Sequence, residues 1–253
     1  MAEAEPVPTW DAVGPPDAPT IVFVHGALMG RAVWRPQIDA LSDRFRCISV
    51  DLPGHGTLRD VPFELDVAAE GVVRAIDEAA GGRTVLVGLS LGGYVAMTVA
   101  SRCPEKVRGL VIAGSTREPT GVSRLAFLLY AGALRLVPES FVRTVALVVF
   151  RRRYGRVVAT AITAGGHFAR GGSRAVRSIA GSRFRERLVA YGGPILVING
   201  TLDLVFRIGA GRFLAGVPGV TNRVIPRAGH LSNVDRPEVF TALVQDFVES
   251  LAP

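Results

Sequence analysis

The chain has 253 residues, of which 49% are hydrophobic, and it carries a formal net charge of +7. This length and composition allow a large buried core, and they favour one α/β domain with an insertion over two small domains. No run of about 18 uncharged apolar residues occurs, so the sequence predicts no membrane-spanning helix. Residues 1–20 lack the basic start and apolar core of a signal peptide, so we expect a cytoplasmic protein.

The positive charge is concentrated in one part of the sequence. Between Arg117 and Ala190 there are 14 arginines against three glutamates, and Lys106 is the only lysine of the chain. No helix-turn-helix, zinc or aromatic-basic motif accompanies this charge, so we expect no nucleic-acid partner. Solvated faces explain most of the arginines, while a patch for an anionic substrate or a membrane surface is the alternative. No Cys/His cluster has metal-ligand spacing, so we expect neither a metal nor a cofactor.

Short apolar runs alternate with segments of helical periodicity, which is typical of βαβ units and a parallel sheet. The expected strands are 20–24, 47–50, 84–87, 107–113, 194–199 and 222–225. The expected helices of this part are 34–44, 66–80, 91–102 and 237–251. The sequence therefore predicts an α/β fold with a mainly parallel twisted sheet flanked by helices.

The alternation fails between residues 117 and 191, where no clear strand occurs. Helical periodicity is present over 125–136, 139–149 and 154–164, and Gly-Gly pairs start at 165, 171 and 192. The apolar stretch 125–150 is interrupted by charged residues, so it is amphipathic rather than membrane-spanning. We expect an inserted helical cap over 117–191, on a core formed by residues 1–116 and 192–253.

The segment Gly88-Leu89-Ser90-Leu91-Gly92-Gly93 follows the apolar run 84–87 and opens a helical segment. A serine at a sharp strand-to-helix turn is lifted out of the sheet to where a base can reach its proton. Side chains two residues on either side would collide with such a turn, which suits glycine at 88 and 92. The backbone N–H of Leu91 then points to where an oxyanion would form. The pattern predicts a nucleophile elbow with Ser90 as nucleophile.

Other chemistry-bearing residues follow three further strands, at their carboxyl ends, where a parallel sheet would gather them. The turn 25–30 reads His-Gly-Ala-Leu-Met-Gly and offers the Ala27 N–H as a second oxyanion donor. Asp203 follows the strand 194–199, and His230 follows the strand 222–225. We expect His230 to be the base that takes the Ser90 proton and Asp203 to orient it.

Four segments resemble the α/β-hydrolase family, in its capped serine hydrolase branch. They are His25-Gly26 with its turn, Asp51-Leu52-Pro53-Gly54-His55-Gly56, the Ser90 turn, and the late Asp203 and His230. The resemblance covers about residues 20–115 and 192–251, and it implies an α/β-hydrolase core with a divergent cap. The family usually begins with two antiparallel strands, whereas only one short edge strand near 9–13, or none, is expected here.

Several residues compete for these roles. Asp235 is the rival acid, although its place just before Arg236-Pro237 favours a helix-start cap. His25 and His55 lie in turns and are expected to support the backbone, as Asp51 is expected to brace them, while His167 is a surface or cap-core residue. An apolar substrate pocket is expected from six residues that could equally be core; they are Leu28, Met29, Phe127, Tyr130, Phe206 and Leu231.

The expected activity is hydrolysis of a small-molecule carboxylic ester, lactone or thioester through a Ser-His-Asp triad and an acyl-enzyme. Members of the resembled family that cleave haloalkanes or epoxides carry aspartate at the elbow. The serine at this position therefore disfavours both of these activities. Two alternatives stay open. One is a non-hydrolytic lyase or synthase that acts on an acyl or carboxylate intermediate, and the other is a membrane-surface lipase favoured by the amphipathic stretch 125–150.

Overall fold

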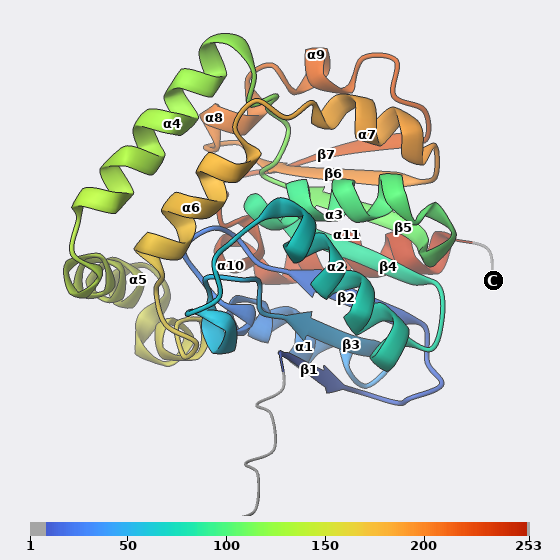
Figure 1. The fold of residues 1–253 in the computed structure, drawn as a ribbon. Coiled ribbons are helices and arrows are strands. Elements are labelled where there is room, and N and C mark those ends of the chain that lie inside the picture. The colour runs from blue at the N-terminus through green and yellow to red at the C-terminus, as the bar shows by residue number, and fades with distance from the viewer. Residues whose placement is uncertain (1–8, 252–253) are drawn as a thin grey trace, which may run out of the picture.

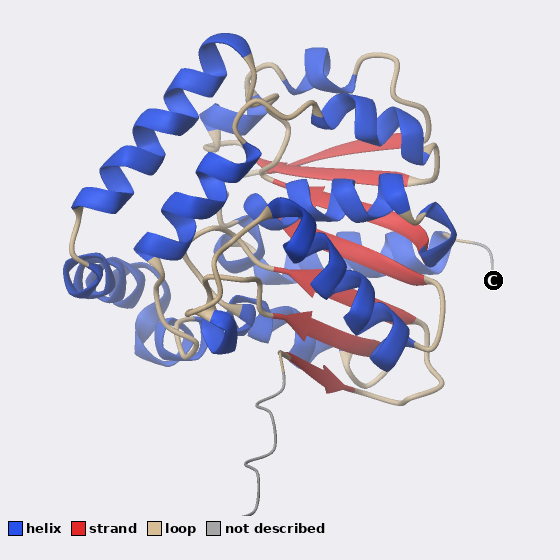
Figure 2. Ribbon diagram, viewed as in Figure 1, coloured by secondary structure: helices blue, strands red, loops and turns tan. Residues whose placement is uncertain are grey.

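The computed structural model describes residues 9–251, which form one sheet with helices on both sides (Figures 1 and 2). The described chain has seven strands, and their bounds are β1 (Trp10–Val13), β2 (Thr20–Val24), β3 (Arg46–Val50), β4 (Thr84–Leu89), β5 (Val107–Ala113), β6 (Ile195–Gly200) and β7 (Val220–Ile225). The strand order is β1-β3-β2-β4-β5-β6-β7. Only β1 runs antiparallel to its neighbour β3, so the predicted mainly parallel sheet and its single short edge strand are confirmed.

Helices cover both faces of the sheet because its central strands are apolar on both sides. Outside the segment between β5 and β6, the helices are α1 (Arg35–Leu41), α2 (Leu65–Ala75), α3 (Leu91–Arg102), α8 (Leu204–Arg207), α9 (Ala210–Leu214), α10 (Ser232–Asp235) and α11 (Pro237–Ser250). The same part of the chain has four short helical turns, which are η1 (Arg31–Trp34), η2 (Gly56–Leu58), η3 (Ile76–Ala80) and η4 (Pro104–Lys106). α2 and α3 lie in front of the sheet in Figure 1, with α1 and α11 behind it. One core cluster fills each face, so every residue of β2 and β4 is buried.

Four helices lie in sequence between β5 and β6: α4 (Gly121–Leu136), α5 (Glu139–Ile162), α6 (Ala169–Ile179) and α7 (Phe184–Tyr191). α4, α5 and α6 stand at the left of Figure 1, beyond the carboxyl ends of the parallel strands, whereas α7 lies beside α3. No single helix among residues 9–251 has the length and hydropathy to cross a membrane; α4 and α5 meet these criteria only as a pair bent by 103°. The division at 117 and 191 stays a prediction.

The structure adds two helices to those expected in this segment. The expected helices 139–149 and 154–164 correspond to the two parts of α5, which meet at a kink at Gly155, where φ is 80°. Helices α6 and α7 were not foreseen, because the Gly171-Gly172 pair disfavours helix in the sequence. In the structure this pair lies inside α6, where a Cβ atom on Gly171 would collide with the backbone of Gly54 and one on Gly172 with that of Ala27. Close packing therefore outweighs helix propensity here.

Candidate active site

Ser90 stands at the turn between β4 and α3, in a backbone conformation that L-residues rarely adopt. Its φ is 55° and its ψ is −117°, and among the described non-glycine residues only Arg227 also has a positive φ. The strain is held in place by the main chain, since Ser90 N donates to Ala113 O at 2.7 Å and Gly93 N donates to Ser90 O at 3.0 Å. The turn thus fixes Ser90 at the carboxyl edge of the sheet.

Close contacts require glycine on both sides of Ser90, as the sequence predicts. A Cβ atom on Gly88 would collide with the backbone of Gly92, and one on Gly92 would collide with the carbonyl of Val24 in β2. The two glycines therefore let α3 start directly against the sheet, with the N–H of Leu91 in its first turn.

The structure brings Ser90, His230 and Asp203 together from three separate strand ends. His230 Nε2 lies 2.9 Å from Ser90 Oγ, and His230 Nδ1 lies 2.8 Å from Asp203 Oδ2. The Asp203 side chain is only 4% exposed, whereas that of His230 is 38% exposed. Phe206 stacks on the imidazole at 4.9 Å between ring centroids. The ring is thereby held with one nitrogen facing the hydroxyl and the other facing the carboxylate.

Gly114 makes room for the His230–Asp203 pair at the end of β5. Its φ is 58°, and a Cβ atom there would lie 2.9 Å from the His230 ring and 3.2 Å from Asp203 Oδ2. The sequence contains Gly114-Ser115-Thr116 at this point, and the role of the glycine was missed because no local pattern identifies it. Ser115 adds support, since its hydroxyl donates to Ser90 O at 2.9 Å.

The turn after β2 passes close to the serine. A Cβ atom on Gly26 would lie 3.4 Å from Ser90 Cβ, so this turn brings the main chain that leads to Ala27 alongside the hydroxyl. His25 and His55, both fully buried, support the turn as expected. His25 Nε2 accepts from Leu52 N at 3.0 Å, and its Nδ1 lies 2.8 Å from Gly26 O. Burial, with a smaller contribution from His55, lowers the pKa of His25 to about 3, so its ring is neutral.

Asp51 braces the same turns. Its side-chain oxygens accept from the backbone N–H of Arg31 at 2.9 Å and from that of Thr57 at 3.0 Å. The Arg31 guanidinium also pairs with it, with Nη1 2.8 Å from Oδ2. Asp51 therefore braces the start of η1 at Arg31 and the turn at Thr57, and within residues 9–251 it makes no hydrogen bond to Ser90.

A mainly apolar cavity of about 540 Å³ opens above Ser90 and His230. Three of the residues expected in the pocket line it, namely Phe127, Tyr130 and Phe206. Leu28, Met29 and Leu231 are not among its lining residues; Met29 is 5% exposed in the core behind the sheet. The sequence analysis missed six further lining residues, which are Tyr94, Arg117, Ala126, Val176, Ile179 and Val205.

Two of these missed residues show what signal was available. Val176 and Ile179 are spaced three apart in α6, which places them on one helical face, but the surrounding arginines and glycines hide this helix. Arg117 lies at the cavity wall with its side chain bound to Ser123 Oγ at 3.2 Å and Val205 O at 2.9 Å. The Arg117 carbonyl accepts from Tyr94 OH at 2.6 Å.

The expectation that Asp235 caps the last helix is wrong. The N-cap of α11 has no side-chain hydrogen bond. Asp235 Oδ1 instead accepts from Arg153 Nε at 2.8 Å and from Tyr154 OH at 2.6 Å, while Oδ2 accepts from Gly229 N at 2.5 Å. Asp235 therefore ties α5 to the turn that carries His230, and it does not contact the imidazole ring.

No group of three His, Cys, Asp or Glu side chains in residues 9–251 is arranged to hold a metal ion. The two cysteines of the chain are free thiols, Cys47 buried and Cys103 half-buried. At this edge of the sheet the structure places a serine, an imidazole and a carboxylate beside an apolar cavity.

Known proteins are similar to this chain in sequence and in fold. Residues 21–243 match the model of the alpha/beta hydrolase family. The chain is 26% identical to 3-oxoadipate enol-lactonase 1 of Acinetobacter baylyi, over 94% of this chain and 91% of that protein. It is 29% identical to the pimeloyl-(acyl-carrier protein) methyl ester esterase of Nitrosomonas europaea, over 89% of this chain and 94% of that protein.

Solved structures agree with this assignment of the fold. A thermophilic esterase from Thermogutta terrifontis superposes with a TM-score of 0.80 at 23% identity, over 96% of this chain and 93% of that one. Because the family model spans most of the chain, the protein belongs to the alpha/beta hydrolase family.

Proposed function

We propose that this protein is a serine hydrolase that cleaves a small-molecule carboxylic ester, lactone or thioester. The observation that carries the proposal is the continuous contact from Ser90 Oγ through the His230 ring to the buried Asp203 carboxylate. Relatives named as an enol-lactonase and a methyl ester esterase support the choice of ester-type bonds. We propose a cytoplasmic enzyme with no cofactor.

In the first half of the reaction, Ser90 Oγ attacks the substrate carbonyl carbon while His230 Nε2 takes the hydroxyl proton. The imidazolium forms between Ser90 and Asp203, whose carboxylate holds Nδ1–H and stabilises the positive charge. Collapse of the tetrahedral intermediate breaks the bond to the leaving group, and His230 returns the proton to that oxygen or sulfur. The products of this half are an acyl-enzyme on Ser90 and a free alcohol or thiol; with a lactone, the alcohol group stays attached to the acyl group on Ser90.

In the second half, water attacks the acyl-enzyme while His230 again accepts a proton, and the carboxylic acid leaves as Ser90 recovers its hydrogen. The negative oxygen of both tetrahedral intermediates needs fixed donors. The proposed donors are the backbone N–H groups of Leu91, at the start of α3, and Ala27, in the turn beside Ser90. Gly92 lies directly against Val24 of β2, and His55 supports the turn at Ala27, so both donors need little reorganisation during the reaction.

The acyl group is proposed to occupy the apolar cavity of about 540 Å³ under the helices of residues 117–191, which act as a cap. Phe127, Tyr130 and Phe206 are its proposed substrate-binding residues, and a cavity of this size suits a small molecule. The structure gives Leu28, Met29 and Leu231 no place in this cavity lining. An ester or thioester is favoured over an amide because its leaving group needs less protonation.

The test compares wild type with Ser90→Ala on short p-nitrophenyl esters, lactones and acyl thioesters. Ser90→Ala should lower kcat by at least about a thousandfold, because it removes the nucleophile and leaves the fold intact. Ser101→Ala is the matched control, since Ser101 lies in α3 and bonds only to Thr98 O. A Ser90→Ala protein that retained the wild-type rate would overturn the proposal.

A second candidate, a lipase acting at a membrane surface, is favoured by exposed apolar side chains on α4 and α5. Leu125, Leu129 and Leu136 are 59%, 65% and 84% exposed, and Phe141 is 61% exposed. Arginines accompany them, as at an interface with anionic lipid. Rates on a dispersed long-chain ester in the presence of anionic vesicles should rise severalfold for such a lipase, and an unchanged rate would remove this candidate.

A further inference from the structure

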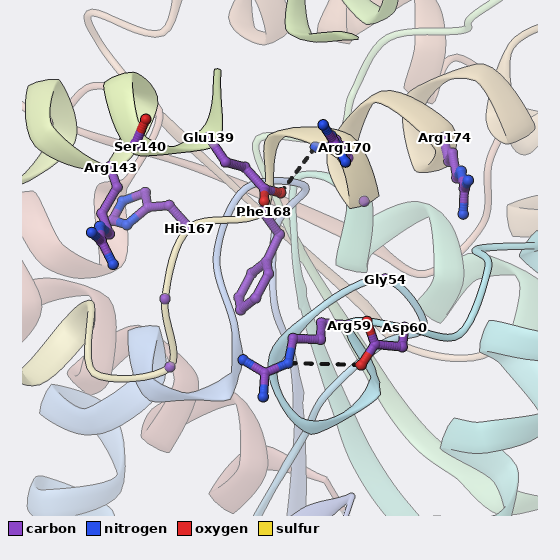
Figure 3. Close-up of a pocket in the computed structure, with 13 residues that line it drawn as sticks. Gly54, Arg59, Asp60, Glu139, Ser140, Arg143, His167, Phe168, Arg170 and Arg174 are labelled. Atoms are coloured by element: carbon purple, nitrogen blue, oxygen red, sulfur yellow. Dashed lines mark hydrogen bonds and ion pairs between the residues drawn. The ribbon is translucent and has the colours of Figure 1, made fainter. Parts of the chain in front are cut away.

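A second hollow of about 550 Å³ lies between the cap helices and the core, apart from the cavity above Ser90. It is bounded by the loop at Gly54, the start of α5, the loop 165–168 and one face of α6 (Figure 3). The proposed chemistry at Ser90 makes no use of it. Its lining is polar, in contrast with the apolar active-site cavity.

Helix α6 forms the wall between the two spaces. Arg170 and Arg174 line the second hollow, whereas Val176 and Ile179 line the active-site cavity. The base of the wall is closed, because Gly171 and Gly172 contact the backbone of Gly54 and Ala27. A ligand in the second hollow therefore does not occupy the space above Ser90.

His167 lines the hollow and has no hydrogen-bond partner among the described residues. The residue is only 8% exposed, yet neither Nδ1 nor Nε2 makes a hydrogen bond within residues 9–251. Burial, together with the charge of Arg143, lowers the pKa of His167, so the ring is neutral with one N–H to donate. A buried polar ring without a hydrogen bond lowers the stability of the fold. A ligand that accepts this hydrogen bond would remove the cost.

Three arginines of the hollow also lack a partner for their guanidinium groups within the described part of the chain: Arg143, Arg170 and Arg174. Arg59 faces Asp60 at 3.9 Å, so that pair is close to neutral. Figure 3 shows Arg143 beside the His167 ring, with Arg170 and Arg174 on the helix opposite. A neighbouring hollow of about 520 Å³ shares Arg170 and Arg174 and adds Arg135 and Arg177.

The first turns of two long helices meet at the same place. Glu139 and Ser140 begin α5, and Arg170 and Gly171 lie in the first turn of α6, so the positive ends of two helix dipoles converge here. Glu139 Oε1 already accepts from Arg170 N at 3.4 Å. An anionic oxygen of the chain itself thus occupies part of the site, and it offsets one of the arginine charges.

We propose that this hollow binds a phosphate group, in a molecule with a second phosphate that reaches the neighbouring arginines. Guanidinium groups bind phosphate oxygens through two parallel hydrogen bonds, and helix N-termini add backbone donors. The neutral His167 supplies a further N–H donor to an oxygen that enters between Arg143 and α6. The shared diphosphate chemistry has two sources, a separate phosphorylated molecule or the phosphorylated part of the substrate.

The test is calorimetric titration of Ser90→Ala with inorganic pyrophosphate at low salt, so that binding is measured independently of hydrolysis. We expect saturable binding of one pyrophosphate. Arg143→Gln should weaken it by about tenfold, because a charge-assisted bidentate contact is lost. His167→Phe keeps the ring packing on Phe150 and should weaken binding about threefold or more through the lost N–H. Glu139→Gln should tighten binding, because it removes the competing negative charge.

Arg124→Gln is the matched control, since Arg124 is an exposed arginine of α4 that does not line the hollow. The absence of saturable binding, equal weakening by Arg124→Gln and Arg143→Gln, or citrate binding as tight as pyrophosphate would each overturn the phosphate site. Arg143 is itself exposed, so its variant should fold even if His167→Phe does not. A higher KM of Arg143→Gln for an acyl-coenzyme A thioester, but not for an uncharged ester, assigns the phosphate to the substrate; an equal KM assigns it to a separate molecule.

Discussion

His55 Nε2 lies 2.7 Å from the carbonyl oxygen of Ala27, and the opposite ring nitrogen, Nδ1, lies 2.9 Å from the carbonyl oxygen of Pro53. Burial holds the pKa of His55 below its ordinary value, so the neutral ring carries one N–H for these two acceptors. The ring also packs edge-on against Phe168 at 5.6 Å. His55 thereby fixes the peptide that follows the proposed oxyanion donor, Ala27 N–H.

Replacing His55 should impair the chemical step more than substrate binding. His55→Ala frees the Ala27 peptide to rotate and removes the ring beneath it, so we expect kcat to fall by about 10- to 100-fold with KM nearly unchanged. Steady-state kinetics on a p-nitrophenyl ester checks this, and thermal melting reports how far the fold is weakened. A variant with wild-type kcat would show that the Ala27 peptide is held by other contacts.

The variants Asp203→Asn and Asp235→Asn should have different effects, the first on kcat and the second on the free energy of unfolding. Asp203→Asn leaves the His230 ring without its charge partner and favours the wrong tautomer, so kcat should fall by about 10³- to 10⁴-fold. Asp235→Asn should keep kcat within about tenfold, because Asp235 does not contact the ring. It should instead lower the free energy of unfolding by about 1–3 kcal/mol, since three donors lose a buried carboxylate partner.

Kinetics and urea unfolding of both variants provide the two measurements. The reverse result, with a large loss of kcat in Asp235→Asn alone, would move the acid of the proposed triad to the other residue.

The buried His25 should make the fold less stable in acid. Its pKa is about 3 in the folded chain against an ordinary value of 6.5, so between these values the unfolded chain binds a proton that the folded chain does not. The contribution of the neutral His25 to the free energy of unfolding is complete above about pH 6.5. It is lost as the pH falls toward 3, by up to about 1.4 kcal/mol per pH unit. His55 adds to the same slope, because its pKa is also lowered.

Urea unfolding at several pH values between 7.5 and 4.5 measures this slope. His25→Gln keeps a donor and an acceptor without a titrating group, so its stability should depend less steeply on pH than that of wild type. An identical slope in both proteins would contradict the assignment to His25.

The acyl preference should respond to the α6 side of the active-site cavity. Val176 is 6% exposed and lines this cavity, so Val176→Phe should shorten the space available to the acyl chain. Each methylene that no longer fits should lower kcat/KM by about fourfold, from about 0.8 kcal/mol of lost burial. A series from acetate to octanoate p-nitrophenyl esters tests this. Val189→Phe on α7, outside the cavity lining, is the control, and an unchanged chain-length profile would argue for binding elsewhere.

The core of the fold could be predicted because its strands are short, apolar and separated by regular helical segments. The expected strand 20–24 is found with the same bounds, and that at 107–113 likewise. The sequence placed Ser90, Asp203 and His230 after three different strands, and parallel strands deliver their carboxyl ends to one edge of the sheet. The confirmed fold class therefore rests on hydrophobic periodicity and on connection rules that are local in sequence.

What could not be predicted depends on contacts between distant segments. The helix α6 contains Gly171 and Gly172 because a larger residue there would collide with the backbone of Gly54 and Ala27, more than a hundred residues earlier in the chain. Asp235 was assigned to a helix cap because its partners, Arg153 and Tyr154, lie on α5, about eighty residues away. Propensity describes a residue's neighbours in sequence, and these three positions are determined by neighbours in space.

The glycine contacts beneath α6 fix the position of this helix on the core. Two backbones in direct contact leave no side chain to rotate out of the way, so α6 cannot tilt without separating from Gly54 and Ala27. α4 packs along α6 and is joined to it by the hydrogen bond from Ser173 Oγ to Ala131 O, so α6 connects α4 to the core. The two glycines therefore hold in place both of the walls that α4 and α6 contribute to the cavity above Ser90.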